Sequence, residues 1–121
     1  MPYTSAGHIA HEISPAQALE IARRRFCRIS ADGILLARRG APYQEIIVEQ
    51  VNRAMEFLAT LTPTKSARAC SYQLKHAAES WAGAYISNGA LIVAAIALGL
   101  KVRSAGRDFE SNPNALIGVR A

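Results

Sequence analysis

The 121-residue sequence has few of the residues from which covalent frameworks and enzyme motifs are built. Its two cysteines, Cys27 and Cys70, are isolated, so neither a CxxC metal motif nor a dense disulfide scaffold is present. Free thiols are the favoured state, and a Cys27–Cys70 disulfide is the alternative. The sequence also lacks a Walker loop and the GxGxxG, HExxH and GxSxG motifs. We therefore expect a non-enzymatic protein without a metal or cofactor.

The N-terminal segment has few apolar anchors. Met1–Ile13 contains neither a basic n-region nor a continuous apolar stretch, which argues against a signal peptide and favours a cytoplasmic protein. His8 and His11 are three residues apart, but a zinc site needs three or four ligands, and the other histidine and the cysteines stand at no recognisable spacing. We interpret 1–13 as a flexible arm and 14–121 as a single globular domain.

Acidic residues are scarce in the second half of the chain. The formal net charge is +5, and Glu79 is the single acidic residue between Lys65 and Arg107. This balance predicts affinity for polyanions, although a merely solvated surface explains it as well. The candidate nucleic-acid-binding side chains of this stretch are Lys65, Arg68, Lys75, Lys101, Arg103 and Arg107.

A first helix is expected from Ser14-Pro15, a hydroxyl N-cap followed by proline at the first helical position. Apolar residues recur at helical spacing as far as Ile29. The opposite face is rich in arginine, which suits phosphate contacts but is more simply a solvated face. It carries Glu20, Arg23, Arg24 and Arg28, with Arg25 towards its edge. Residues 26–38 fit either a hairpin across the Asp32-Gly33 turn or a further helical turn.

Two further helices are expected over 43–60 and 66–81. The apolar stripe of the first is Ile47, Val51, Ala54, Leu58 and Leu61, and Thr62-Pro63-Thr64 closes it. The inner stripe of the second is Cys70, Leu74, Ala77, Ala78 and Trp81, which leaves Gln73, Lys75 and Glu79 outside. His76 and Glu79 lie three apart, and acid–base catalysis would require a pocket that joins them to Tyr85. A surface interaction between the imidazole and the carboxylate is the favoured interpretation.

From Ala90 to Leu100 no side chain is polar. A helix that is apolar on every face is buried in a protein core or in a membrane. Residues 82–100 form a stretch of 19 residues without a charge, near the length of a membrane span, but Ser87-Asn88-Gly89 interrupts it. We therefore expect a buried helix over 88–98 and no membrane partner. Ser87 is its expected N-cap and Gly99 its expected C-terminal stop.

Beyond Gly99 the pattern changes to that of short strands. Residues 100–103 alternate in polarity and 115–119 are largely apolar, which predicts a C-terminal β-hairpin. The expected fold is therefore α+β and helix-dominated, with about four helices packed around 88–98 and a small C-terminal hairpin.

Three stretches carry a resemblance to known proteins: Ser71–Glu79 (SYQLKHAAE), Tyr85–Ala95 (YISNGALIVAA) and Asn112–Ala115 (NPNA). In them the chain resembles a group of small bacterial proteins carried by prophages, plasmids and integrative elements. The resemblance covers roughly 60–119. It implies a bacterial cytoplasmic setting and a role in a mobile element, and it assigns no catalytic residues.

The order helix, short turn, helix and hairpin is found in winged helix-turn-helix proteins. A recognition helix presents polar side chains to base edges, but in 88–98 only the N-terminal end, with Ser87 and Asn88, offers any. We therefore expect Asn88 and the basic residues to contact the nucleic-acid backbone without sequence readout. The alternative is a protein-interaction module that regulates or inhibits a host complex, and it would expose an apolar patch.

Overall fold

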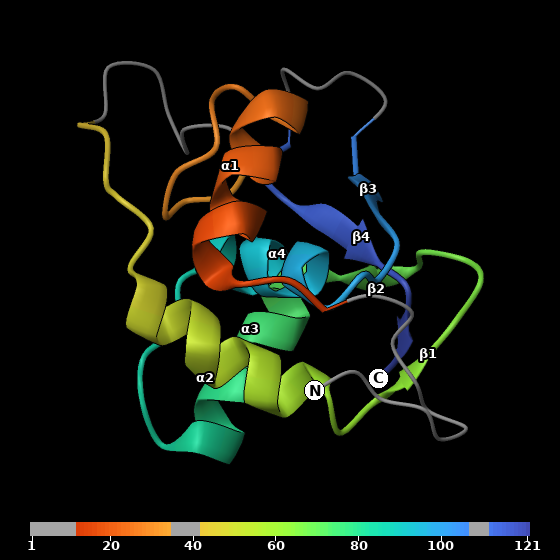
Figure 1. Cartoon of the computed structure of the whole chain (residues 1–121). Helices are drawn as coiled ribbons and strands as arrows, with labels where there is room; N and C mark the ends of the chain where they lie inside the picture. The colour runs from red at the N-terminus through yellow and green to blue at the C-terminus, as the bar shows by residue number, and fades with distance from the viewer. Residues whose placement is uncertain (1–11, 35–41, 107–111) are drawn as a thin grey trace.

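The computed structural model describes residues 12–34, 42–106 and 112–121, and in these ranges four α-helices combine with short antiparallel strands (Figure 1). The helices are α1 (Pro15–Arg25), α2 (Val48–Leu58), α3 (Ser71–Ala82) and α4 (Asn88–Ala97). The strands are β1 (Thr62–Pro63), β2 (Ala69–Cys70), β3 (Val102–Ser104), β4 (Ala115–Ile117) and β5 (Val119–Arg120). The predicted helix-dominated α+β fold is confirmed. Apart from 12–13, the expected N-terminal arm lies outside the described residues.

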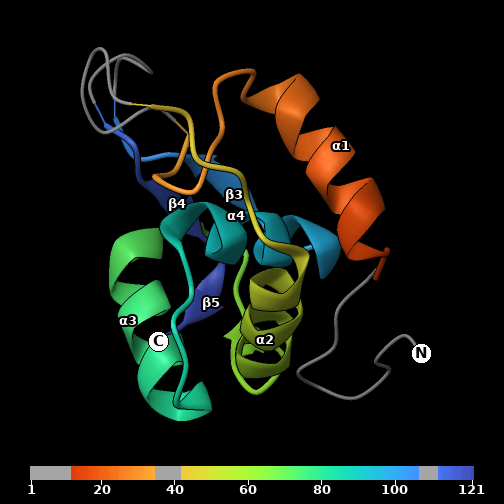
Figure 2. The same cartoon turned by 90° about the vertical axis from the view of Figure 1, so that its left-hand side faces the viewer.

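Helix α4 is the centre of the fold, and all of its residues are buried. Helices α1, α2 and α3 pack around it, and β3 and β4 contact it as well (Figures 1 and 2). The Ser87 hydroxyl accepts a hydrogen bond from the Ala90 N–H at 3.1 Å, and Gly99 has a left-handed φ of +77°. The predicted buried helix and both of its end signals are thus confirmed. None of the helices in the described ranges has the length and apolarity that a membrane crossing requires.

Helix α1 begins as predicted. The Ser14 hydroxyl accepts from the Gln17 N–H at 3.2 Å, and the Gln17 side chain accepts from the Ser14 N–H, which together form a capping box. After α1, Ser30 and Gly33 exchange two backbone hydrogen bonds of 2.9 and 3.0 Å. Of the two structures expected for 26–38, the described part therefore adopts a tight hairpin-like turn, and 35–38 lie outside the described residues.

Helix α2 begins at Val48, five residues later than predicted from the sequence. Ile47 is its N-cap residue, has an extended backbone and is 53% exposed. The stripe Val51, Ala54 and Leu58 is buried as predicted, and the Glu49–Arg53 ion pair forms at 3.2 Å.

The inner face of α3 differs from the predicted one. Its buried residues are Ser71, Leu74, Lys75 and Ala78, whereas Ala77 and Trp81 are exposed. The prediction is confirmed for Leu74 and Ala78, and it was wrong for Lys75 because it placed every charged side chain outside. Lys75 is buried because Glu79, one turn later, neutralises its charge. The thiols of Cys27 and Cys70 are free, as favoured from the sequence.

Strand β4 organises a three-stranded antiparallel sheet in the order β2-β4-β3. The predicted hairpin is the β3–β4 pair, in which Val102 faces Ile117 and Ser104 faces Ala115. Strand β2 adds to the other edge of β4, and β1 pairs with β5 in a separate two-stranded sheet. Strands β1, β2 and β5 have two residues each, too few to show the alternation by which a strand is recognised.

Candidate functional site

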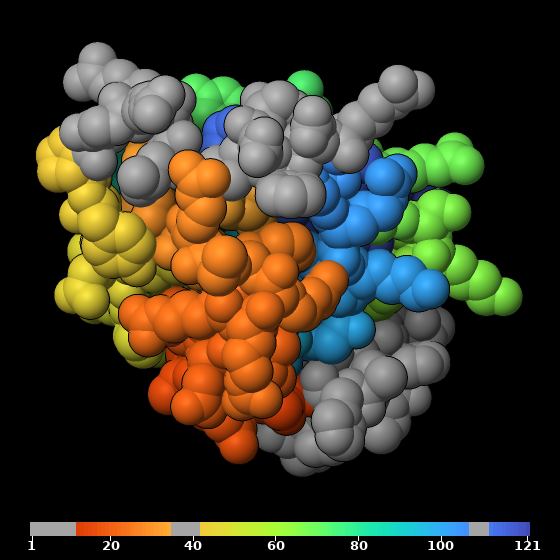
Figure 3. Space-filling model, turned by 90° about the horizontal axis from the view of Figure 1, so that it is seen from above, coloured from red at the N-terminus to blue at the C-terminus, as the bar shows by residue number. Residues whose placement is uncertain are grey.

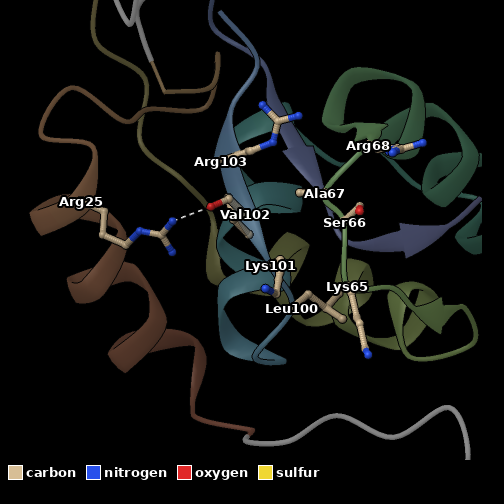
Figure 4. A pocket seen from close by; sticks show the side chains of 9 residues that line it. All are labelled: Arg25, Lys65, Ser66, Ala67, Arg68, Leu100, Lys101, Val102 and Arg103. Carbon is tan, nitrogen blue, oxygen red and sulfur yellow. Dashed lines mark hydrogen bonds between the residues drawn. The ribbon is translucent and has the colours of Figure 1, made fainter. Parts of the chain in front are cut away.

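Five basic side chains surround one hollow of about 610 Å³ on the surface (Figure 4). They come from three parts of the chain: the end of α1, the segment before β2, and the segment that enters β3. The buried residues Ala67, Leu100 and Val102 also line the hollow, so a few apolar side chains lie among the charged ones. The five cations are Arg25, Lys65, Arg68, Lys101 and Arg103.

The backbone of Gly118, between β4 and β5, holds two of these segments together. Its N–H donates to the Lys101 carbonyl and its carbonyl accepts from the Thr64 N–H, each at 2.8 Å. A Cβ atom on Gly118 would lie 2.9 Å from the Thr64 carbonyl oxygen, which leaves glycine as the residue that fits this approach. The positions of Lys65 and Lys101 are thus fixed by backbone contacts at a single residue.

The third segment is the end of α1, and its last residue, Arg25, connects it to β3. Its Nη2 atom donates a hydrogen bond to the carbonyl of Val102 in β3, shown as the dashed line in Figure 4. Its guanidinium also lies 5.2 Å from the centre of the Phe26 ring. Seen from above, the orange surface of α1 directly borders the blue surface of the segment containing β3 (Figure 3).

The charge of the hollow is not compensated by the described part of the chain. All five cationic residues are exposed, and none of them forms an ion pair with an acidic side chain in 12–34, 42–106 or 112–121. The ion pairs that do form use Arg24, Arg53 and Lys75, which lie elsewhere. Convergent cations at a concave surface concentrate positive potential and attract anions.

Four of the residues predicted from the sequence therefore meet at one place: Lys65, Arg68, Lys101 and Arg103. Arg107 lies outside the described residues. Arg25 was not among the predicted site residues, and its position in an arginine-rich helix was the one signal that could have found it. Its partner Val102 is 77 residues away in the chain, so no local pattern connects them.

Lys75 and Asn88 do not join the hollow. Lys75 is 7% exposed, and its Nζ atom lies 3.3 Å from the Glu79 carboxylate. Asn88 is 6% exposed, and its Nδ2 atom donates to the Asp32 carbonyl at 3.0 Å and to Asn114 Oδ1 at 2.9 Å. Both side chains are used inside the fold and lie away from the hollow, so their expected contact with a nucleic acid stays a prediction.

Glu79 is the acceptor of a small polar network. Its carboxylate accepts from the Ile86 N–H at 3.1 Å, lies 3.3 Å from Lys75 Nζ, and lies 3.1 Å from His76 Nδ1. Burial raises the pKa of this carboxyl, but the hydrogen bonds from Ile86 and Lys75, the Lys75 charge and the His76 contact outweigh it, and the pKa is lowered. The favoured surface interaction between His76 and Glu79 is confirmed.

We expect Glu79→Gln to lower the free energy of unfolding at neutral pH by about 2 kcal/mol, because an amide loses the charge that Lys75 requires. Since folding lowers the pKa of Glu79, its stabilising contribution is present above the ordinary value of 4.5 and is lost as pH falls through the folded value. Urea unfolding of the wild type and of Glu79→Gln across pH should therefore give a constant difference in the free energy of unfolding above pH 4.5. This difference should shrink as the pH falls below 4.5. A difference independent of pH would contradict the assignment.

No family model, curated protein or solved structure matches this chain.

Proposed function

We propose that this protein is a small non-enzymatic nucleic-acid-associated protein that contacts the phosphate backbone through the basic hollow. The observation that carries the proposal is the convergence of five exposed cations from three distant segments around one concavity. Phosphate oxygens are the groups that Arg and Lys side chains most often contact in protein–DNA complexes. The backbone contacts of Gly118 and the Arg25–Val102 hydrogen bond hold this arrangement in the folded state.

The composition of the lining favours contact with the backbone over readout of sequence. Base edges are read by paired donors and acceptors, with Asn, Gln, Arg or Glu entering a groove on a projecting element. Among the described residues, the lining of the hollow holds no Asn, Gln, Asp or Glu side chain, and its arginines and lysines surround a concave surface instead of standing on a projecting element; the hydroxyl of Ser66 is the neutral polar side chain there. Helix α4, which has the place of a recognition helix in the chain order, is buried. Binding is therefore expected to be independent of sequence.

The proposed setting is the bacterial cytoplasm, in a protein of a mobile element, and the resemblance of 60–119 to prophage and plasmid proteins supports it. A protein partner is the competing function. The large hydrophobic side chains exposed in the described ranges come from two groups, Tyr43, Ile47 and Val48 before and in α2, and Tyr72, Trp81 and Tyr85 in and after α3. The five cations thus lie around one hollow, whereas the exposed hydrophobic side chains are divided between two places. This distribution favours a nucleic acid over a protein as the partner.

Duplex DNA of mixed sequence should bind at low salt and dissociate steeply as salt rises. If about four phosphates are neutralised, affinity should fall roughly 100-fold between about 50 mM and 200 mM salt. Fluorescence anisotropy with two labelled duplexes of unrelated sequence measures both the salt slope and the independence of sequence. Absence of binding at the lowest salt, or binding that salt does not change, would overturn the proposal.

A further inference from the structure

A second cavity, of about 320 Å³, lies where the start of α4 meets α3, the turn at Ala31–Asp32 and the segment Pro113–Asn114. Its lining includes the two side chains that the basic hollow does not use, Lys75 and Asn88. This volume is at the lower end of the range for small-molecule sites.

Asn88 supplies an unsatisfied acceptor in this lining. The Asp32 carbonyl can only accept, so its contact with Nδ2 fixes the orientation of the Asn88 amide. The Oδ1 atom is then buried and has no hydrogen-bond partner among the described residues. Because buried polar atoms are nearly always paired, this oxygen calls for a donor from outside the fold.

Two tyrosine rings flank the same cavity. Tyr72 is 51% exposed and Tyr85 is 62% exposed, although both line the cavity. The Lys75 ammonium lies 4.6 Å from the centre of the Tyr85 ring and 6.0 Å from that of Tyr72. The rings therefore leave exposed surface on which a flat molecule can stack.

The charges around this cavity disfavour several classes of ligand. An anion is disfavoured because Glu79, outside the lining, already neutralises Lys75 and because Asp32 in the lining is acidic. A cation is disfavoured because the Lys75 ammonium, which lies over one side of the Tyr85 ring, would repel it. An aliphatic group would leave the Asn88 oxygen unpaired. A neutral, flat molecule with hydrogen-bond donors and acceptors along its edge satisfies all of these groups.

We propose that this cavity binds a nucleobase, stacked against Tyr85 or Tyr72, with a ring-edge or exocyclic N–H donating to Asn88 Oδ1. The inference rests on the proposed function for its ligand class, because the phosphate contacts of the basic hollow would also hold a single strand, whose bases are unpaired. The base has two sources, an unpaired position in a single strand or a free nucleoside. In single-strand binding proteins, stacking of bases on aromatic side chains is the common mode of recognition.

Uncharged nucleosides test the cavity separately from the basic hollow, because they carry no phosphate. Adenosine, guanosine, cytidine and thymidine are titrated into the full chain at high salt, with amide shifts followed by NMR. We expect saturable shifts around Asn88 and Tyr85, and a roughly tenfold weaker affinity in Tyr85→Ala. Tyr43→Ala, which removes a tyrosine that is 51% exposed outside this lining, is the matched control and should bind as the wild type does.

Titration with a single-stranded oligonucleotide distinguishes a base in a single strand from a free nucleoside as the ligand. If Tyr85→Ala weakens the single strand about tenfold and leaves duplex binding unchanged, the base comes from the strand. If nucleosides bind but the single strand is unaffected by the substitution, the ligand is a free nucleoside. If none of the nucleosides shifts these amides at millimolar concentration, the base site is overturned, whatever the duplex result. Nucleoside binding without duplex binding would overturn the proposed backbone function and leave the base site standing.

Discussion

Conversion of Lys65, Arg68, Lys101 and Arg103 to glutamine together is expected to weaken binding of duplex DNA by at least about 100-fold at low salt. Each of these side chains lies on the rim of the hollow and is exposed, so the substitutions remove positive charge without disturbing the core. Each phosphate contact also releases counterions, and removing about four contacts should flatten the salt dependence almost completely. Anisotropy titrations at several salt concentrations measure the affinity and the slope in one experiment.

The matched control replaces four arginines that do not line the hollow: Arg23, Arg24, Arg53 and Arg120. Both variants change the formal net charge from +5 to +1, because each loses four positive charges from the same total. If the hollow is the binding site, the control keeps most of the affinity and most of the salt slope. An equal loss in both variants would show that net charge alone attracts the DNA, and it would contradict the placement of the site.

The sequence predicts which basic residues are exposed at the hollow, but it does not predict the contacts that bring the three segments together. Lys101 and Arg103 flank a strand signal and are exposed, as expected, because alternation in β3 turns Val102 inward. The approach of Arg25 could not be predicted, since it depends on how α1 packs across α4. The backbone contacts of Gly118 with Thr64 and Lys101 could not be predicted either, because a glycine between two strand signals gives no indication of which backbone groups it contacts.

The fold was predictable where a residue acts locally. Ser14-Pro15 and Ser87 begin their helices because their side chains bond the next turn, whatever the rest of the chain does. Lys75 shows the limit of this reasoning. Its burial depends on Glu79, and in an isolated helix the same pair would stabilise an exposed face equally well. The hydrophobic pattern of α3 thus placed Lys75 outside, whereas the contacts of α3 with α4 and of Lys75 with the two tyrosines cover it in the fold.

Replacement of Gly89 by alanine is expected to lower the free energy of unfolding by about 3 kcal/mol, although alanine is the better helix former. Gly89 lies in the first turn of α4 against the backbone of the Ser30–Gly33 turn, and its N–H donates to the Ala31 carbonyl at 3.0 Å. A Cβ atom there would lie 1.9 Å from the Ser30 carbonyl oxygen and 2.8 Å from its carbon. Backbone on both sides of this contact has no rotamer to change, so the turn and the helix would have to separate.

Gly83→Ala distinguishes this close approach from the general effect of losing a glycine. Gly83 has a left-handed φ of +68°, and a Cβ atom there would meet no other part of the fold within 4 Å, so alanine brings strain of about 1 kcal/mol and no collision. Thermal and urea unfolding should therefore rank the proteins as wild type, Gly83→Ala and Gly89→Ala in order of falling stability. A Gly89→Ala protein as stable as Gly83→Ala would show that α4 does not rest directly on the turn. In that case the contacts that bury Asn88 beside Asp32 would need another explanation, and the base site that depends on the Asn88 oxygen would lose its support.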